Sequence, residues 1–288
     1  MSLPIKKLYI DTKYKSRESV SNSNFKIDLP QTLYFPDNSV FYIDDISIPH
    51  SWYTIEENMN DKLYIEISHV DSNVGTTVDS YQIVTISPGI YNGVELALEI
   101  QTNIEASINN SIFPNLLSVS YNSKRNSINI TTGYVDIRFK ILTADDIYTK
   151  LNDTWLGSSY DVNNPHSIND IIGNTIDKNS PFYTSSISYK AALNLQPIRN
   201  IYIHSSLGNY NTLSNWGSQT IVKKIPVTAN SGDYIFDQVM TGNDFGDCSK
   251  QTLRSISFEL KDSNNNYIPM HGNHLSFSVI FSRMNPEM

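Results

Sequence analysis

The chain has one cysteine, Cys248, among 288 residues, and charged residues make up only 17% of it. A single cysteine cannot form an internal disulfide, which excludes a disulfide framework and fits either a reducing compartment or a protein that needs no disulfides. Acidic residues outnumber basic ones by 29 to 21, which gives a formal net charge of −8. A protein that coats nucleic acid should instead be basic, and the sequence shows no specific nucleic-acid site.

Long apolar runs and enzyme motifs are also missing. No stretch approaches the ~20 apolar residues of a membrane-spanning helix, and Met1 to Lys7 lack the apolar core of a signal peptide. There is no phosphate-binding loop, no G-x-G-x-x-G, no G-x-S-x-G and no H-E-x-x-H. We therefore predict a protein that is not an enzyme, has no catalytic, cofactor-binding or metal-binding residues, and spans no membrane.

The sequence is rich in strand signals. Its 18 Tyr and 11 Phe favour strands and interfaces. From Thr252 to Phe281, two arms alternate strictly between apolar and polar residues, which is typical of half-buried antiparallel strands. The residues between the arms, Asp262 to Asn266, favour tight turns. This stretch predicts a β-hairpin that closes one wall of a β core, with partners that come largely from residues before about 82.

The rest of the chain divides into β-rich flanks and a mixed middle. Before residue 82 the strand candidates are Leu8–Asp11, Phe25–Leu29, Ser39–Ile48 and Lys62–Ser68. A helix should begin at Asn92, with Glu95 in capping-box position, and a shorter one should follow Thr143. Strand patterns return after residue 175. We predict a mainly β fold: a single antiparallel jelly-roll sandwich, residues 1–82 and 175–288, interrupted by a small α+β insertion domain, residues 83–174.

Two groups of residues resemble metal ligands. Asp262, Asn264 and Asn266 begin like a calcium loop, but Tyr267 replaces the required Gly, so a plain hairpin turn is the alternative. His271 and His274 form an H-x-x-H that would need further ligands, such as the remote Cys248. Their alternative is two polar loop histidines.

Paired carboxylates are the remaining candidates for chemistry. Neighbouring side chains on a strand or a helix do not face each other, so Glu56–Glu57 and Asp145–Asp146 are interpreted as solvated charges. Asp44–Asp45 interrupts a strand and marks either a bulge or a contact with a partner. An enzyme of the cupin kind would need clustered ligands, whereas the six His are scattered and only His204 sits in a clear strand.

Several segments resemble one protein family. They are Phe41–Tyr53, Ile86–Leu96, Ile203–Leu213, Ile221–Ala229, Asp247–Arg254 and His274–Phe281. Together they resemble the minor capsid (penton) proteins of virophages and Polinton/Maverick-type elements, nearest the mavirus type. The resemblance implies a single jelly roll that forms homopentamers at the icosahedral vertices, next to a double-jelly-roll major capsid protein. It also implies a virion protein that is assembled inside the host cell, in the cytoplasm, and some members of the family carry an inserted domain.

Two functions of different classes stay open at this point. The first is the structural capsid protein, with the insertion domain as a further site for a host receptor or glycan. The second is a jelly-roll module that binds carbohydrate or a receptor on a virion or cell surface, with Trp52, Trp155 and Trp216 as stacking platforms. The alternative for each Trp is packing in the core.

Overall fold

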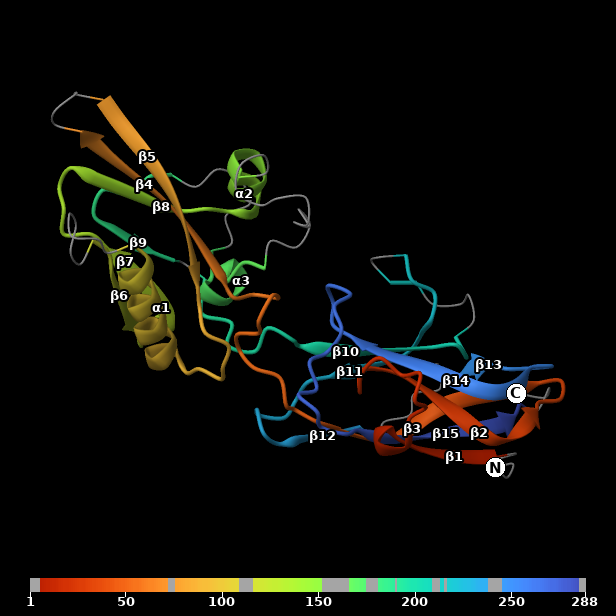
Figure 1. The fold of residues 1–288 in the computed structure, drawn as a ribbon. Helices are drawn as coiled ribbons and strands as arrows, with labels where there is room; N and C mark the ends of the chain where they lie inside the picture. Colours follow the sequence, from red (N-terminus) through yellow and green to blue (C-terminus); the bar gives the residue numbers. More distant parts are fainter. Residues whose placement is uncertain are drawn as a thin grey trace. The chain divides into compact units, whose positions relative to one another are not determined.

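The computed structural model describes residues 6–71, 76–108, 116–151, 166–174, 181–189, 191–208, 213–214, 217–237 and 245–284. The chain forms two compact units: unit 1 comprises residues 1–52 and 198–288, and unit 2 comprises residues 53–197 (Figure 1). Within the described residues all strand pairs are antiparallel. The prediction of a mainly β, antiparallel fold is confirmed.

Unit 1 contains two sheets. Sheet A has the order β1 (Lys6–Asp11), β15 (Ser276–Arg283), β3 (Ser39–Pro49) and β12 (Tyr234–Asp237), and β13 (Gly246–Asp247) also pairs with β3. Sheet B has the order β11 (Ile221–Pro226), β10 (Asn200–Ser205), β14 (Thr252–Lys261) and β2 (Asn24–Tyr34). A short 3-10 helix, Thr12–Tyr14, follows β1.

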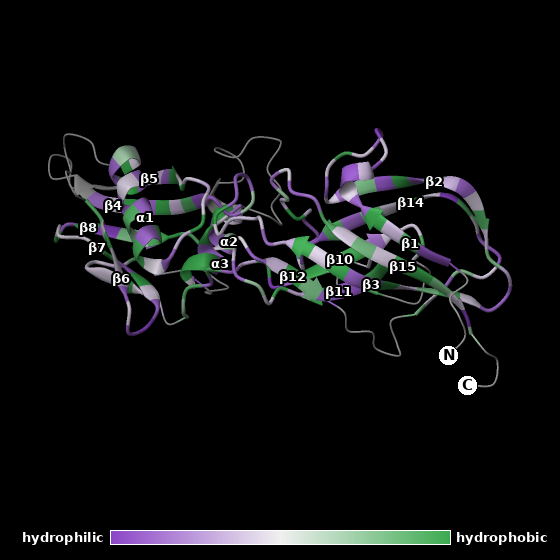
Figure 2. Ribbon diagram, turned by 90° about the horizontal axis from the view of Figure 1, so that it is seen from below, coloured by the Kyte–Doolittle hydropathy of each residue, from purple (hydrophilic) through white to green (hydrophobic). Residues whose placement is uncertain are grey.

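One apolar core lies between these two sheets. The Phe258 ring of β14 meets the Phe277 ring of β15 edge-on, with 5.0 Å between ring centroids, and stacks on Phe25 of β2 at 5.5 Å. All three rings are at most 2% exposed. Alternation of green and purple along these strands shows that each sheet has one apolar face (Figure 2). Burying a Phe side chain contributes about 1.5–3 kcal/mol, so this cluster is a main stabilising element of unit 1.

The predicted hairpin between residues 252 and 281 is wrong. β14 belongs to sheet B and β15 to sheet A, so the two strands do not pair. After Lys261 the chain turns back on β14, where Ile268 N donates to Leu260 O at 3.0 Å, and then crosses to the other sheet. The two apolar faces meet across the core instead, because strict alternation identifies a buried face without identifying the neighbouring strand.

The predicted long-range partners are confirmed. β14 pairs with β2, and β15 pairs with both β1 and β3, all of which precede residue 82. Among the described strands of the C-terminal flank, β10 is the one that pairs with β14. The N-terminal and C-terminal parts of unit 1 therefore form one core together and cannot fold as separate sheets.

Unit 2 has its own core of strands and helices. One sheet has the order β5 (Thr76–Thr85), β4 (Lys62–Asp71) and β8 (Ile137–Ile141). The other has the order β6 (Ser118–Asn122), β7 (Ser127–Thr131) and β9 (Ser186–Ser188). The helices are α1 (Gly93–Ile108), α2 (Ala144–Leu151) and α3 (Asn169–Ile172).

Both predicted helix starts are confirmed. Asn92 Oδ1 accepts from the backbone N–H groups of Val94 and Glu95 at 3.0 Å, and Glu95 Oε2 accepts from Asn92 N at 2.9 Å. This reciprocal pair satisfies backbone donors that the first turn of a helix leaves free. Thr143 Oγ1 accepts from Asp146 N at 3.2 Å at the start of α2.

The boundaries of the two units differ from those drawn on the sequence. The chain passes between the units near residues 52 and 197, whereas the sequence placed the insertion at residues 83–174. The strand β4, assigned to the first half of the jelly roll, pairs with β5 and β8 inside unit 2. The alternating pattern of β4 fits a strand of either unit, so the sequence pattern alone could not assign this strand to unit 2.

Candidate functional site

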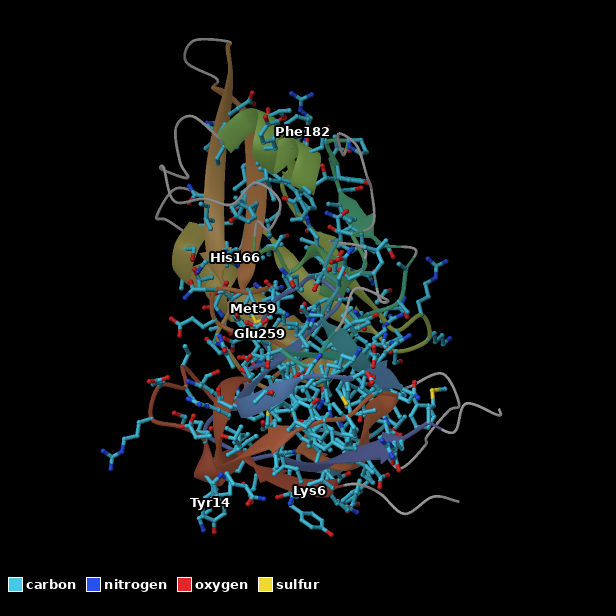
Figure 3. The ribbon with its side chains drawn as sticks, turned by 90° about the vertical axis from the view of Figure 1, so that its right-hand side faces the viewer. Lys6, Tyr14, Met59, His166, Phe182 and Glu259 are labelled. Carbon is cyan, nitrogen blue, oxygen red and sulfur yellow. The ribbon has the colours of Figure 1, made fainter. Side chains whose placement is uncertain are left out.

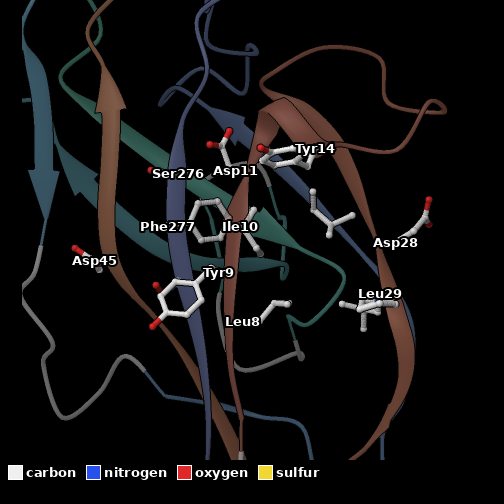
Figure 4. Close-up of a pocket in the computed structure, with 13 residues that line it drawn as sticks. Leu8, Tyr9, Ile10, Asp11, Tyr14, Asp28, Leu29, Asp45, Ser276 and Phe277 are labelled. Atoms are coloured by element: carbon white, nitrogen blue, oxygen red, sulfur yellow. The ribbon is translucent and has the colours of Figure 1, made fainter.

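A hollow in unit 1 lies beside the edge strands β1 and β2 (Figure 4). It has a volume of about 560 Å³. It is lined by Leu8, Tyr9, Ile10, Asp11, Tyr14, Ile27, Asp28, Leu29, Pro30, Asp45, Ser276, Phe277 and Ser278. β1 ends sheet A and β2 ends sheet B, so the hollow follows the side on which the sandwich is open.

The chemistry of this hollow fits a protein surface better than a catalytic centre. Its apolar side chains, such as Leu8 and Leu29, pack against the core of unit 1. Tyr9 and Tyr14 stand at its edge, 74% and 75% exposed, and Tyr14 projects from the surface in Figure 3. An end strand presents unpaired backbone N–H and C=O groups, which can add a strand from a partner.

The opposite end of sheet A also exposes aromatic rings. Tyr234 and Phe236 of β12 are 54% and 68% exposed, and their rings stack with 6.1 Å between centroids. Aromatic residues are enriched at protein interfaces. Sheet A therefore has exposed aromatic rings at both of its edges, at β1 and at β12.

The acidic pair Asp44–Asp45 marks a bulge. Asp45 has a φ of 54°, and the pairing of β3 with β15 shifts register next to it, from Ser276–Ser47 to Ser278–Asp44. A bulge inserts an extra residue and bends the strand. Asp44 Oδ2 lies 4.0 Å from Lys7 Nζ on β1, and Asp45 is exposed. The structure thus supports the bulge, one of the two sequence-based interpretations.

Asp262 organises a turn through its own carboxylate. Its Oδ1 accepts from the backbone N–H groups of Asn264 and Asn266, each at 2.8 Å. Burial raises the pKa of Asp262, against the effect of these hydrogen bonds. The side chain that would begin a calcium loop thus forms an Asx turn. A turn was the alternative that the sequence offered here, but the chain continues from it to sheet A and does not form a hairpin.

His271, His274 and Cys248 do not form a cluster. His274 Nδ1 lies 3.2 Å from Thr12 Oγ1, which ties the loop before β15 to the end of β1. Cys248 is fully buried, and burial raises its pKa to about 12. Among the described residues no three His, Cys, Asp or Glu side chains are grouped closely enough to hold a metal ion.

Two of the four paired carboxylates are buried, so their interpretation as solvated charges is wrong. Glu56 is 5% exposed, and its Oε1 accepts from Tyr53 N at 2.6 Å, which closes a tight loop. Asp146 is fully buried in unit 2, where its Oδ1 lies 2.8 Å from Lys140 Nζ. Their neighbours Glu57 and Asp145 are exposed, as expected.

The buried ion pair of unit 2 includes a third charge. Glu66 Oε2 lies 3.8 Å from Lys140 Nζ, and Tyr81 OH donates to Glu66 Oε1 at 3.1 Å. The side chains of Lys140 and Glu66 are 5% and 1% exposed. Asp146 and Lys140 join α2 to β8, and Glu66 extends the group to β4, so these charges hold the helix against the sheet. A sequence signal existed, because Lys140 and Asp146 flank the N-cap Thr143.

His204 in β10 contacts two hydroxyl side chains that directly precede β11. Its Nδ1 is 3.0 Å from Thr220 Oγ1 and 3.2 Å from Ser218 Oγ. Glu259 is its cross-strand partner, but both Glu259 oxygens are already engaged, by Lys261 and Tyr267. Burial lowers the pKa of His204, with a further contribution from Lys261. A serine and a histidine are thus adjacent, but Glu259 is committed to other partners and does not orient the ring.

The three tryptophans give little support to a carbohydrate site. Trp52 is 1% exposed and packs beside His50, with 4.2 Å between ring centroids. A buried ring cannot stack on a sugar, so core packing is the correct alternative for Trp52. Trp155 and Trp216 lie outside the described residues.

The geometry of unit 1 defines a mainly β protein with two antiparallel sheets and exposed aromatic residues at two ends of sheet A. No family model and no curated protein matches the sequence. The structure is similar to the crystal structure of the selenomethionine-labelled mavirus penton protein, with a TM-score of 0.50 and 13% sequence identity. The similarity covers 96% of this chain and 99% of that chain. At this identity the comparison shows a distant likeness of fold.

No helix among the described residues is long and apolar enough to cross a membrane.

Proposed function

We propose that this protein is a structural component of a viral capsid: a minor capsid (penton) protein that forms homopentamers at the icosahedral vertices. The observation that carries the proposal is the likeness of fold to a penton protein over almost the whole length of both chains. The exposed aromatic ends of sheet A support it, because a protein that acts by assembly needs such surfaces. The proposal includes a virophage-type virion, assembled in the cytoplasm of the host cell.

In this proposal, unit 1 is the jelly roll and unit 2 is the domain inserted into it. The support is topological: β14 and β15 complete sheets begun by β1, β2 and β3, so the chain leaves unit 1 and returns to finish it. Because unit 1 folds around the inserted unit, unit 2 can carry a function of its own with little loss of stability in the core of unit 1. The jelly roll would contact the double-jelly-roll major capsid protein, and the inserted unit would remain available for other partners, such as a host receptor or glycan.

A ring of identical chains needs two different, complementary patches on each chain. Unit 1 exposes aromatic residues on two different surfaces, one beside β1 and β2 and one on β12. We propose that these two meet between neighbouring copies. The protein acts through assembly alone in this account, without catalysis and without a cofactor.

Co-expression with a major capsid protein tests the function. The wild-type chain should enter purified particles in a ratio of five copies per vertex, and Tyr9→Ser with Phe236→Ser should reduce that ratio strongly. The matched control is Tyr267→Ser, an exposed aromatic (43%) on the loop after β14. Wild-type protein that stays out of the particles would refute the proposal, and equal losses for the control would refute the assignment of the patches.

A further inference from the structure

The whole net charge of the protein lies in unit 2. Residues 53–197 contain 16 acidic and 8 basic residues, a formal charge of −8, whereas unit 1 contains 13 of each and is formally neutral. A unit with such a charge attracts cationic partners and repels nucleic acid and anionic membranes. We therefore expect the net charge of unit 2 to determine which charged partners the protein attracts.

Helix α1 carries an apolar stripe that is exposed to solvent. Ile90, just before the helix, and Val94 and Leu98 within it are 56%, 62% and 66% exposed. Val94 and Leu98 are four residues apart, so their side chains lie next to each other on one face of the helix, whereas Ile90 precedes the helix. The core face of α1 is formed by other residues: Leu96, Ala97, Ile100, Ile104 and Ile108. The helix thus buries one apolar face in unit 2 and exposes Val94 and Leu98 on another.

Acidic residues lie next to this stripe. α1 contains Glu95, Glu99 and Glu105 and no Lys or Arg. Glu105 follows Leu98 by seven residues, which places it on the same face, and both Glu95 and Glu105 are exposed. The exposed face of α1 therefore combines aliphatic side chains with negative charge.

We propose that this face of α1 binds a cationic amphipathic segment of another protein. The apolar residues of that segment, spaced three or four apart, would cover Val94 and Leu98, and its Lys or Arg residues would approach Glu95 and Glu105. An amphipathic segment would lay its apolar face on this exposed helix face, and charge would set the choice of partner. The inference goes beyond the role at the vertex and does not depend on it.

Other occupants fit the chemistry less well. A second copy of α1 would bring the same carboxylates together, and like charges across an interface are unfavourable. A nucleic acid or an anionic membrane would meet the same repulsion. A sugar would need an aromatic platform, and the stripe is aliphatic.

A labelled peptide tests the proposal on the full-length protein. The probe is an amphipathic peptide of about five helical turns, composed only of Leu and Lys. Fluorescence anisotropy should detect binding to the wild-type chain. A peptide of the same composition in scrambled order keeps the charge but lacks the apolar face. Its affinity should be lower by at least roughly tenfold.

Surface variants locate the site. Val94→Ser with Leu98→Ser should weaken binding by roughly tenfold or more, because both apolar contacts are lost. The matched control is Val135→Ser, which changes a 90% exposed side chain elsewhere in unit 2. Glu105→Gln should weaken binding and reduce its salt dependence, whereas Asp136→Asn, also at an exposed site, should not.

Three outcomes would overturn the inference. They are absence of binding to the wild-type protein, equal binding of the scrambled peptide, and an equal effect of the Val135 control. Circular dichroism of each variant keeps the result independent of misfolding, since all five substitution sites are exposed to solvent.

Discussion

Truncation of Phe258 measures how strongly the two sheets of unit 1 depend on each other. The ring is fully buried between Phe25 of its own sheet and Phe277 of the other. Phe→Ala at such a site costs about 3–5 kcal/mol, from lost burial and from the cavity that remains. For a domain of this size each kcal/mol lowers the melting temperature by about 2–4 °C. Phe258→Ala should therefore lower the melting temperature of unit 1 by roughly 6–20 °C.

Differential scanning calorimetry of the full chain can show this directly. Each unit has its own core, so we expect separable contributions from unit 1 and unit 2. Phe258→Ala should shift the transition of unit 1 and leave that of unit 2 in place. Phe236→Ala, at a 68% exposed ring of the same unit, serves as the control and should change stability by no more than about 0.5 kcal/mol. Equal shifts for the two variants would refute the assignment of Phe258 to the interior of a sandwich.

Three further predictions concern single side chains. Asn92→Ala removes the N-cap of α1 and should cost unit 2 about 1 kcal/mol in urea unfolding; no loss would mean that the cap contributes nothing. Because burial lowers the pKa of His204 in the folded state, the unfolded state binds the proton more readily, so stability from this residue is present above pH ~6.5 and is lost as the pH falls below it. His204→Asn should flatten the pH dependence of unfolding in that range, and an unchanged slope would contradict the argument. Cys248, with a pKa raised to about 12 by burial, should react with a thiol reagent at pH 8 only after unfolding, and rapid labelling of native protein would contradict its placement.

Local structure could be predicted well from the sequence. The caps at Asn92 and Thr143 follow from side chains that hydrogen-bond to the next turn of backbone, an interaction within a few residues. The alternation in β14 and β15 correctly identified the apolar side chains that face the core, although Ser278 and Ile280 on the other face of β15 are buried as well. The long-range partners of these strands were also correct, because neither flank alone could cover its apolar face.

Other features depend on distant neighbours and were missed. The hairpin prediction was wrong because two strands that each have an apolar face can be neighbours in one sheet or can lie in two sheets that face each other across a core. The burial of Asp146 depends on Lys140 in β8, and that of Glu56 depends on backbone donors in its own loop. A charged residue looks the same in sequence whether water or a buried partner satisfies it.

The division of charge between the units separates two roles. Unit 1 is formally neutral and exposes aromatic rings at two ends of sheet A, which suits close contact between copies. Unit 2 is strongly acidic and exposes an aliphatic row on α1, which suits a cationic partner. Variants of one unit should therefore leave the binding properties of the other unchanged.

Electron cryo-microscopy of capsid particles tests the central claim most directly. Particles should be assembled from the major capsid protein with and without this chain and reconstructed with icosahedral symmetry. The account predicts density for five copies of unit 1 at every vertex when the chain is present, and open vertices when it is absent. Closed vertices without the chain, or its density elsewhere in the shell, would contradict the proposed function.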